Sequence, residues 1–66
     1  MNNPITTAKA DAIRDRFLAQ AVQHRADAAA FRAQGDTVNA DALDRLAESK
    51  DRMAAKRYET MTVRAI

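Results

Sequence analysis

The chain has 66 residues, with 11 Lys and Arg, 9 Asp and Glu, and no Cys. A chain this short forms one domain, residues 1–66, and without Cys it has no disulfide framework and no thiolate for a metal or a nucleophile. The net charge of +2 is weak evidence for nucleic-acid binding, and no stretch approaches the roughly 18 apolar residues of a membrane span. We therefore expect a soluble cytoplasmic protein without a membrane partner.

The first predicted helix spans residues 4–34. Asn3 can cap it with Pro4 at the first helical position, and Thr6 or Thr7 is the alternative, later start. No Gly or Pro interrupts the chain from there to the predicted end, and Ala, Arg, Gln and Leu, which favour helices, dominate the segment. The helix is therefore about 45 Å long.

The chain is expected to reverse at its single glycine, Gly35. Glycine readily adopts the left-handed conformation that ends many helices, and Asp36 or Thr37 can cap the helix that follows. We expect the second helix over residues 37–62 and a frayed tail over residues 62–66, where threonines and a valine lower the helix propensity. No strand pattern competes, so the fold class is all-α, an antiparallel two-helix hairpin.

Apolar side chains recur along a broad face of the first helix and along a stripe of the second. Of the 31 apolar residues, 16 are Ala, so two helices alone bury only a thin core. We expect a partner to complete this core, either a second copy in a dimeric four-helix bundle or a larger protein. The predicted partner or dimer interface has seven members: Phe17, Leu18, Val22, His24, Phe31, Leu46 and Met53.

Folding at Gly35 places the single histidine, His24, near Lys50, and places Phe17 near Arg57 or Tyr58. One interpretation of the first pair is a polar layer that fixes the register and responds to pH, because a cation opposite an imidazole disfavours its protonation. The other, more common situation is that both side chains cover apolar surface with their stems and keep their polar ends in water. Both interpretations stay open at this point.

Catalytic patterns are missing from the sequence. It has one Ser, one His and no Cys, and a lone glycine makes no phosphate-binding loop. A single histidine with Asp27 one turn away supplies two metal ligands at most. An Ala-rich hairpin also offers no concave pocket for a small-molecule substrate. We therefore predict a protein that is not an enzyme and has no catalytic residue, metal site or cofactor.

Charge is unevenly distributed along the predicted hairpin. Asp36, Asp41 and Asp44 follow the turn, whereas basic residues gather at the end away from Gly35, here called the open end. Helix dipoles favour such a pattern, and an antiparallel dimer would place each acidic turn beside the partner's basic open end. The possible contacts to nucleic acid or an acidic partner are Arg14, Arg16, Arg52, Lys56, Arg57 and Arg64.

In size and expected architecture the chain resembles the Rop family of small plasmid RNA-binding proteins, helical hairpins that dimerise into four-helix bundles. The resemblance implies a nucleic-acid-binding regulator that uses the basic open end. Our preferred hypothesis is a non-enzymatic protein–protein interaction module. Small helical proteins of this kind often act as inhibitors, adaptors or regulators, including some that phages and plasmids encode, by occupying the surface of a larger protein.

Overall fold

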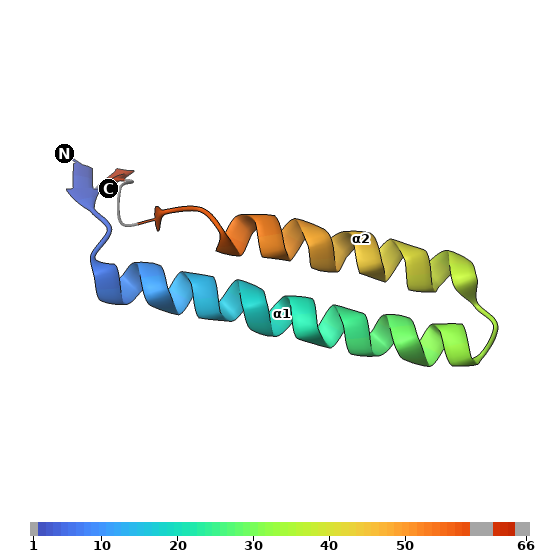
Figure 1. Cartoon of the computed structure of the whole chain (residues 1–66). Helices are drawn as coiled ribbons and strands as arrows, with labels where there is room; N and C mark the ends of the chain where they lie inside the picture. The colour runs from blue at the N-terminus through green and yellow to red at the C-terminus, as the bar shows by residue number, and fades with distance from the viewer. Residues whose placement is uncertain (1, 59–61, 65–66) are drawn as a thin grey trace.

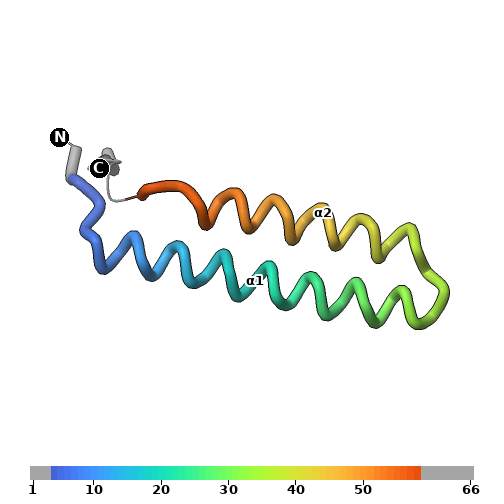
Figure 2. The backbone as a smooth tube through the Cα atoms, viewed as in Figure 1, coloured from blue at the N-terminus to red at the C-terminus, as the bar shows by residue number. Residues whose placement is uncertain are grey.

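The computed structural model describes residues 2–58 and 62–64. The elements follow in the order β1 (Asn2–Pro4), α1 (Thr7–Ala33), α2 (Thr37–Ala54) and β2 (Thr62–Arg64). Figures 1 and 2 show the two helices side by side and antiparallel. β1 and β2 pair at the open end (Figure 1). The molecule is a rod with extents of 51 × 19 × 17 Å. The predicted antiparallel helical hairpin is confirmed.

The first helix begins at the later of the two predicted starts. Thr6 is the N-cap of α1, and its hydroxyl accepts a hydrogen bond of 3.2 Å from the backbone N–H of Lys9. Pro4 lies in β1 and not at the first helical position. The hydroxyl satisfies one of the N–H groups that a helix start leaves without a backbone partner, and this local bond fixes where the helix begins.

The turn has the geometry that its residues predict. Gly35 has φ of +81°, and its N–H donates to the carbonyl of Arg32 at 3.0 Å. The N–H of Asp36 donates to the carbonyl of Phe31 at 2.9 Å, which completes a Schellman motif at the end of α1. The carboxylate of Asp36 then accepts from the N–H of Asn39 at 3.1 Å and caps α2. One residue therefore closes the first helix and starts the second.

Replacing Gly35 with Ala is expected to lower the free energy of unfolding by about 1 kcal/mol, because an L-residue is strained at positive φ. Apart from Gly35 and its two chain neighbours, no atom lies within 4 Å of the position that a Cβ would take, so the cost is backbone strain. Urea unfolding followed by circular dichroism measures the change. Asn tolerates this conformation better than Ala, so Gly35→Asn serves as the control and should lose less stability. Equal losses in the two variants would contradict this explanation.

The second helix is shorter than predicted. The expected helix over residues 37–62 ends at Ala54, and Thr62–Arg64 instead pairs antiparallel with Asn2–Pro4. The β-branched residues that lower helix propensity in this segment suit extended backbone. This short strand pair is an element that the sequence pattern did not indicate, and the all-α helical hairpin is otherwise as predicted. Residues 65–66 of the predicted tail lie outside the described residues.

The two helices pack through alanine. No side chain larger than alanine is fully buried among the described residues, and the buried ones are 0–6% exposed. Small side chains let two helix backbones approach closely, so larger neighbours are held at the edges of the contact. These buried residues are called the alanine row, and they are Ala10, Ala21, Ala28, Ala40, Ala47 and Ala54.

Candidate functional site

One side of the hairpin is charged and paired internally. Arg25 of α1 forms an ion pair with Asp51 of α2, and Arg32 binds Asp41 at 3.0 Å and Asp44 at 2.8 Å. These hydrogen bonds raise the pKa of both guanidinium groups above the usual arginine value. We call this side, defined by these five residues, the charged flank. Its charges already have partners within the chain.

Aromatic contacts mark the opposite side. Phe17 of α1 stacks on Tyr58, with ring centroids 6.2 Å apart and an interplanar angle of 21°, which confirms the predicted proximity of the two. The ammonium of Lys50 lies over the same ring, 5.5 Å from its centroid. A cation over an aromatic face is attracted by the ring quadrupole, so Lys50 fixes which side of α2 meets Phe17.

Helical spacing assigns the remaining members of this side. His24 and Phe31 follow Phe17 at intervals of seven residues, and on α2 the apolar residues lie three, four and seven positions from Lys50. Residues at these spacings share one face of a helix. We call this side the apolar flank, and its residues are Phe17, His24, Phe31, Leu43, Leu46, Lys50 and Met53.

The apolar flank is open to solvent. Leu46 is 47% exposed, and Phe17, Phe31, Leu43 and Met53 are half-buried. The alanine row holds the helices so close that these larger side chains project from the edge of the contact and do not enter it. Five of the seven residues predicted for the partner interface lie here. Leu43 was not predicted for the interface, although its seven-residue spacing from Lys50 would have identified it.

The other two predicted interface residues lie elsewhere. Leu18 is 43% exposed and Val22 is 67% exposed. Leu18 precedes Arg25 by seven residues, so it shares the face of α1 that carries the charged flank, and Val22 lies further round on the same side. The structure therefore divides the predicted interface between two sides of the hairpin. Val38, 77% exposed at the start of α2, is an apolar residue that the sequence did not indicate.

The position of Lys50 bears on the predicted His24 and Lys50 layer. His24 is half-buried on the apolar flank, as the heptad pattern indicates. The stem of Lys50 extends so that its ammonium lies above Phe17, the geometry of a long side chain that covers apolar surface. This contact agrees with the second of the two interpretations of the layer.

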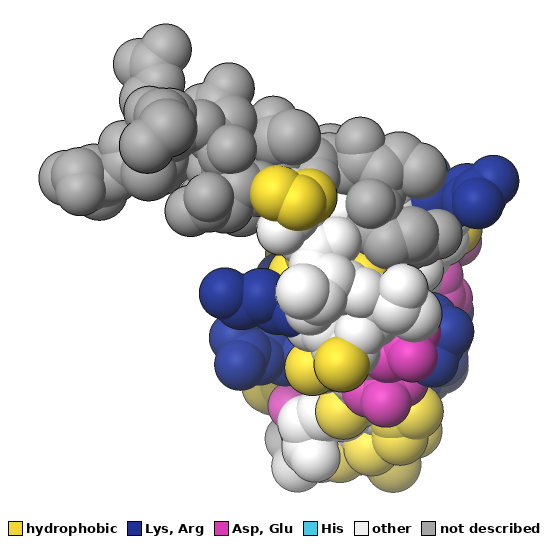
Figure 3. Space-filling view, turned by 90° about the vertical axis from the view of Figure 1, so that its left-hand side faces the viewer, with side chains coloured by type: hydrophobic (Ala, Val, Ile, Leu, Met, Phe, Trp, Pro, Cys, Tyr) yellow, Lys and Arg dark blue, Asp and Glu magenta, His cyan; other side chains and the backbone are white. Residues whose placement is uncertain are grey.

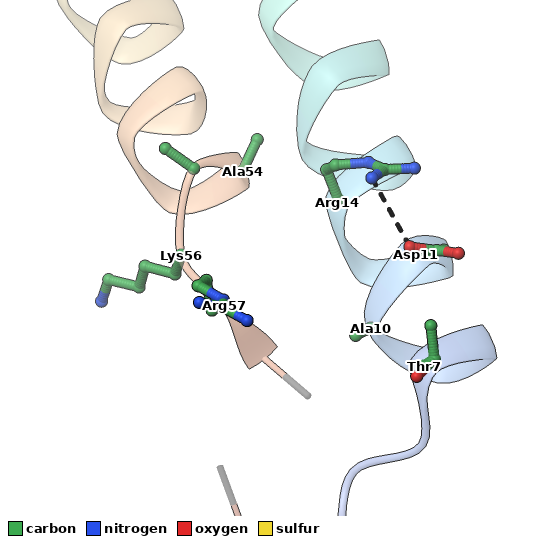
Figure 4. Close-up of a pocket in the computed structure, with 8 residues that line it drawn as sticks. Thr7, Ala10, Asp11, Arg14, Ala54, Lys56 and Arg57 are labelled. Carbon is green, nitrogen blue, oxygen red and sulfur yellow. Dashed lines mark ion pairs between the residues drawn. The ribbon is translucent and has the colours of Figure 1, made fainter. Parts of the chain in front are cut away.

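Part of the predicted basic set surrounds a hollow of roughly 450 Å³ at the open end, where Arg14, Lys56 and Arg57 line it with Thr7 and Asp11. Figure 4 shows Arg14 turned to Asp11 of its own helix, at 3.5 Å, while Lys56 extends away from α1. These two cations do not converge on one point. The hollow is therefore basic at its rim.

The rest of the predicted basic set points in other directions. Arg16 and Arg52 are both exposed. Arg16 is five residues from Ala21 and Arg52 is five residues from Ala47, which places each arginine about 140° around its helix from the alanine row. The side chain of Arg64 lies outside the described residues. Figure 3, which looks at the open end, shows Lys and Arg side chains on both sides of the rod. Nucleic-acid binding by this set stays a prediction.

The described residues form neither a metal site nor a membrane-spanning helix. Across residues 2–58 and 62–64, no three His, Asp or Glu side chains are grouped so that they could hold a metal ion. Neither helix combines the length and apolar character that crossing a bilayer requires, over the same residues. The apolar flank thus stands as the candidate functional surface.

Comparison with known proteins gave no match to any family model, curated protein or solved structure. The resemblance to the Rop family therefore rests on size and hairpin architecture alone. Proteins of one fold have many unrelated functions, so the function of this chain follows from its surfaces and not from its hairpin fold.

Proposed function

We propose that the protein is a non-enzymatic helical interaction module that acts by placing its apolar flank against another protein surface. In this role it serves as an inhibitor, adaptor or regulator in the cytoplasm, and it uses no cofactor. The working residues are Phe17, Phe31, Leu46 and Met53, which supply apolar contact, with His24 and Lys50 between them.

The observation that carries the proposal is that the hairpin buries its small alanines and leaves larger apolar side chains partly exposed. Only alanine is buried between the helices, while five larger apolar side chains from both helices line one flank, four of them half-buried and Leu46 exposed. Burying apolar area stabilises by roughly 25 cal/mol per Å², so covering the part of these side chains that is still exposed adds stability. A protein surface placed on the flank would cover that part.

The contrast between the two flanks supports the choice of side. On the charged flank, ion pairs already join α1 to α2, so a partner there would have to displace or desolvate paired charges. On the apolar flank the interhelix contacts are aromatic stacking and a cation over a ring, and the exposed members are uncharged. An apolar centre with charged surroundings is the usual anatomy of a protein interface.

A photo-cross-linking amino acid at position 46 tests the proposal. It replaces Leu46 in the full-length chain, expressed in its native cell, and mass spectrometry identifies whatever is attached. The matched control carries the same group at Val22, which is exposed on the other side of the hairpin. We expect cross-linked protein from position 46 and little from position 22. Absence of a product at position 46, or equal yields at both positions, would overturn the proposal.

A further inference from the structure

We infer that a second copy of this chain occupies the apolar flank, antiparallel to the first, with the two-fold axis at the level of His24. This inference rests on the proposed function and names the occupant of the same surface. Three features of the structure support it: the spacing of the flank residues on α1, the charges at the two ends of the rod, and the length of the rod.

The residues that α1 contributes to the flank are spaced symmetrically. His24 lies midway between Phe17 and Phe31, seven residues from each, which corresponds to about 10 Å of helix on either side. A two-fold axis at His24 that reverses the rod brings Phe17 of one copy to the level of Phe31 of the other. Each aromatic side chain then meets an apolar region, and the polar residues of both copies meet at the centre. Such self-complementarity is what an isologous interface requires.

Lys50 is compatible with this arrangement. Its ammonium lies over Phe17, which is on the open-end side of His24. Because the two copies are reversed, the two ammonium groups are displaced from the axis in opposite directions. Their mutual repulsion is therefore weaker than it would be if both lay at the centre.

The charges at the ends favour the antiparallel over the parallel arrangement. The open end, residues 7–17 and 52–58, carries six basic and two acidic side chains, and the turn end, residues 32–44, carries one basic and three acidic side chains. Arg32 neutralises part of the acidic turn by pairing with Asp41 and Asp44, and an acidic excess remains. Reversed copies place opposite excess charges together, whereas parallel copies would place like charges together at both ends.

The rod is long enough for a dimer contact. The flank spans about 21 Å from Phe17 to Phe31, α1 spans about 40 Å, and the rod is 19 × 17 Å across. A contact along the whole of α1 and roughly 15 Å wide buries on the order of 600 Å² per copy, the lower limit of a standard stable interface, so residues beyond the flank toward both ends have to contribute. The second copy also requires no further gene product to complete the core.

Light scattering on the purified full-length chain measures the mass directly. We expect twice the chain mass of 7.3 kDa at micromolar concentration. Leu46→Glu should weaken dimerisation by about tenfold or more, because it places a charge in the buried interface. Val22→Glu, an exposed change on the other side, should leave the mass unchanged. A wild-type monomer, or an equal effect of both changes, would overturn the inference.

Disulfide trapping tests the arrangement without relying on a destabilised variant. The chain has no Cys, so His24→Cys introduces the only thiol. At the two-fold axis the pair is close enough to bond, whereas the control Gln34→Cys places its thiols about 30 Å apart along the rod. We expect oxidation to trap the His24→Cys dimer at least about tenfold faster than the control. Equal rates would overturn the antiparallel dimer.

The two experiments distinguish failure of this inference from failure of the proposed function. If the cross-linker at position 46 attaches only to a different protein and the purified chain is a monomer, the flank is an interaction surface whose occupant is not a second copy. If it attaches to nothing, both proposals are wrong.

Discussion

Replacing Ala28 with Leu is expected to lower the free energy of unfolding by about 1–3 kcal/mol, because added methylenes in a close-packed contact force the backbones apart. Ala28 is 0% exposed and lies opposite the alanines of α2, where the helix separation is set by side chains of this size. For a chain this short, a loss of that size is a large share of the total stability. Thermal unfolding followed by circular dichroism measures it.

The matched control for Ala28→Leu is Ala26→Leu, two residues away on the same helix. Ala26 is exposed, so the larger side chain meets solvent there and the free energy of unfolding should change by less than about 0.5 kcal/mol. Helix propensity is nearly the same for Ala and Leu, so it does not distinguish the two variants. Similar losses at both positions would show that the alanine row does not set the distance between the helices.

Replacing Phe17 with Ala is expected to cost about 2 kcal/mol and to release the chain that follows α2. The ring contacts both Tyr58 and the ammonium of Lys50, so its removal deletes a stacking contact and a cation over an aromatic face together. The chain contains one Tyr and no Trp, so the near-ultraviolet signal of tyrosine reports on Tyr58 alone. We expect that signal to fall at temperatures where the helices remain folded.

Phe17→Leu separates the two contributions of the ring. It retains most of the apolar area, so the free energy of unfolding should fall by less than in Phe17→Ala. It removes the aromatic surface, so the tyrosine signal should still fall. An unchanged tyrosine signal in both variants would mean that the stack with Tyr58 does not hold this segment against α1.

The positions of the helix ends show why some local features were predictable. Gly35 and Asp36 act through bonds to residues within five positions along the chain, so the turn could be derived from the sequence. The end of α2 could not be derived from the sequence in this way. After Ala54 the chain contains no Gly or Pro, and the helix stops where Tyr58 can stack on Phe17 and where β2 can pair with β1. Those partners are distant in sequence.

The candidate surface was predictable in composition but not in position. Alanine is apolar and recurs on nearly every side of α1, so the sequence pattern gave a broad face that included Leu18 and Val22 with Phe17. The structure separates them, because the buried alanines fix which side of α1 meets α2. The ion pairs of Arg25 and Arg32 then occupy one flank and the ring contacts of Phe17 the other.

The sequence by itself determined the helical hairpin, its turn at Gly35 and the thin core, because helix propensity, capping and side-chain volume are local properties. Only the tertiary structure decided that alanine alone is buried between α1 and α2, that α2 ends at Ala54, and that one flank is charged while the other is apolar. These features depend on how closely two helices approach and at what rotation. Contacts between residues far apart in the chain set this distance and this rotation. The periodicity within one helix does not predict them.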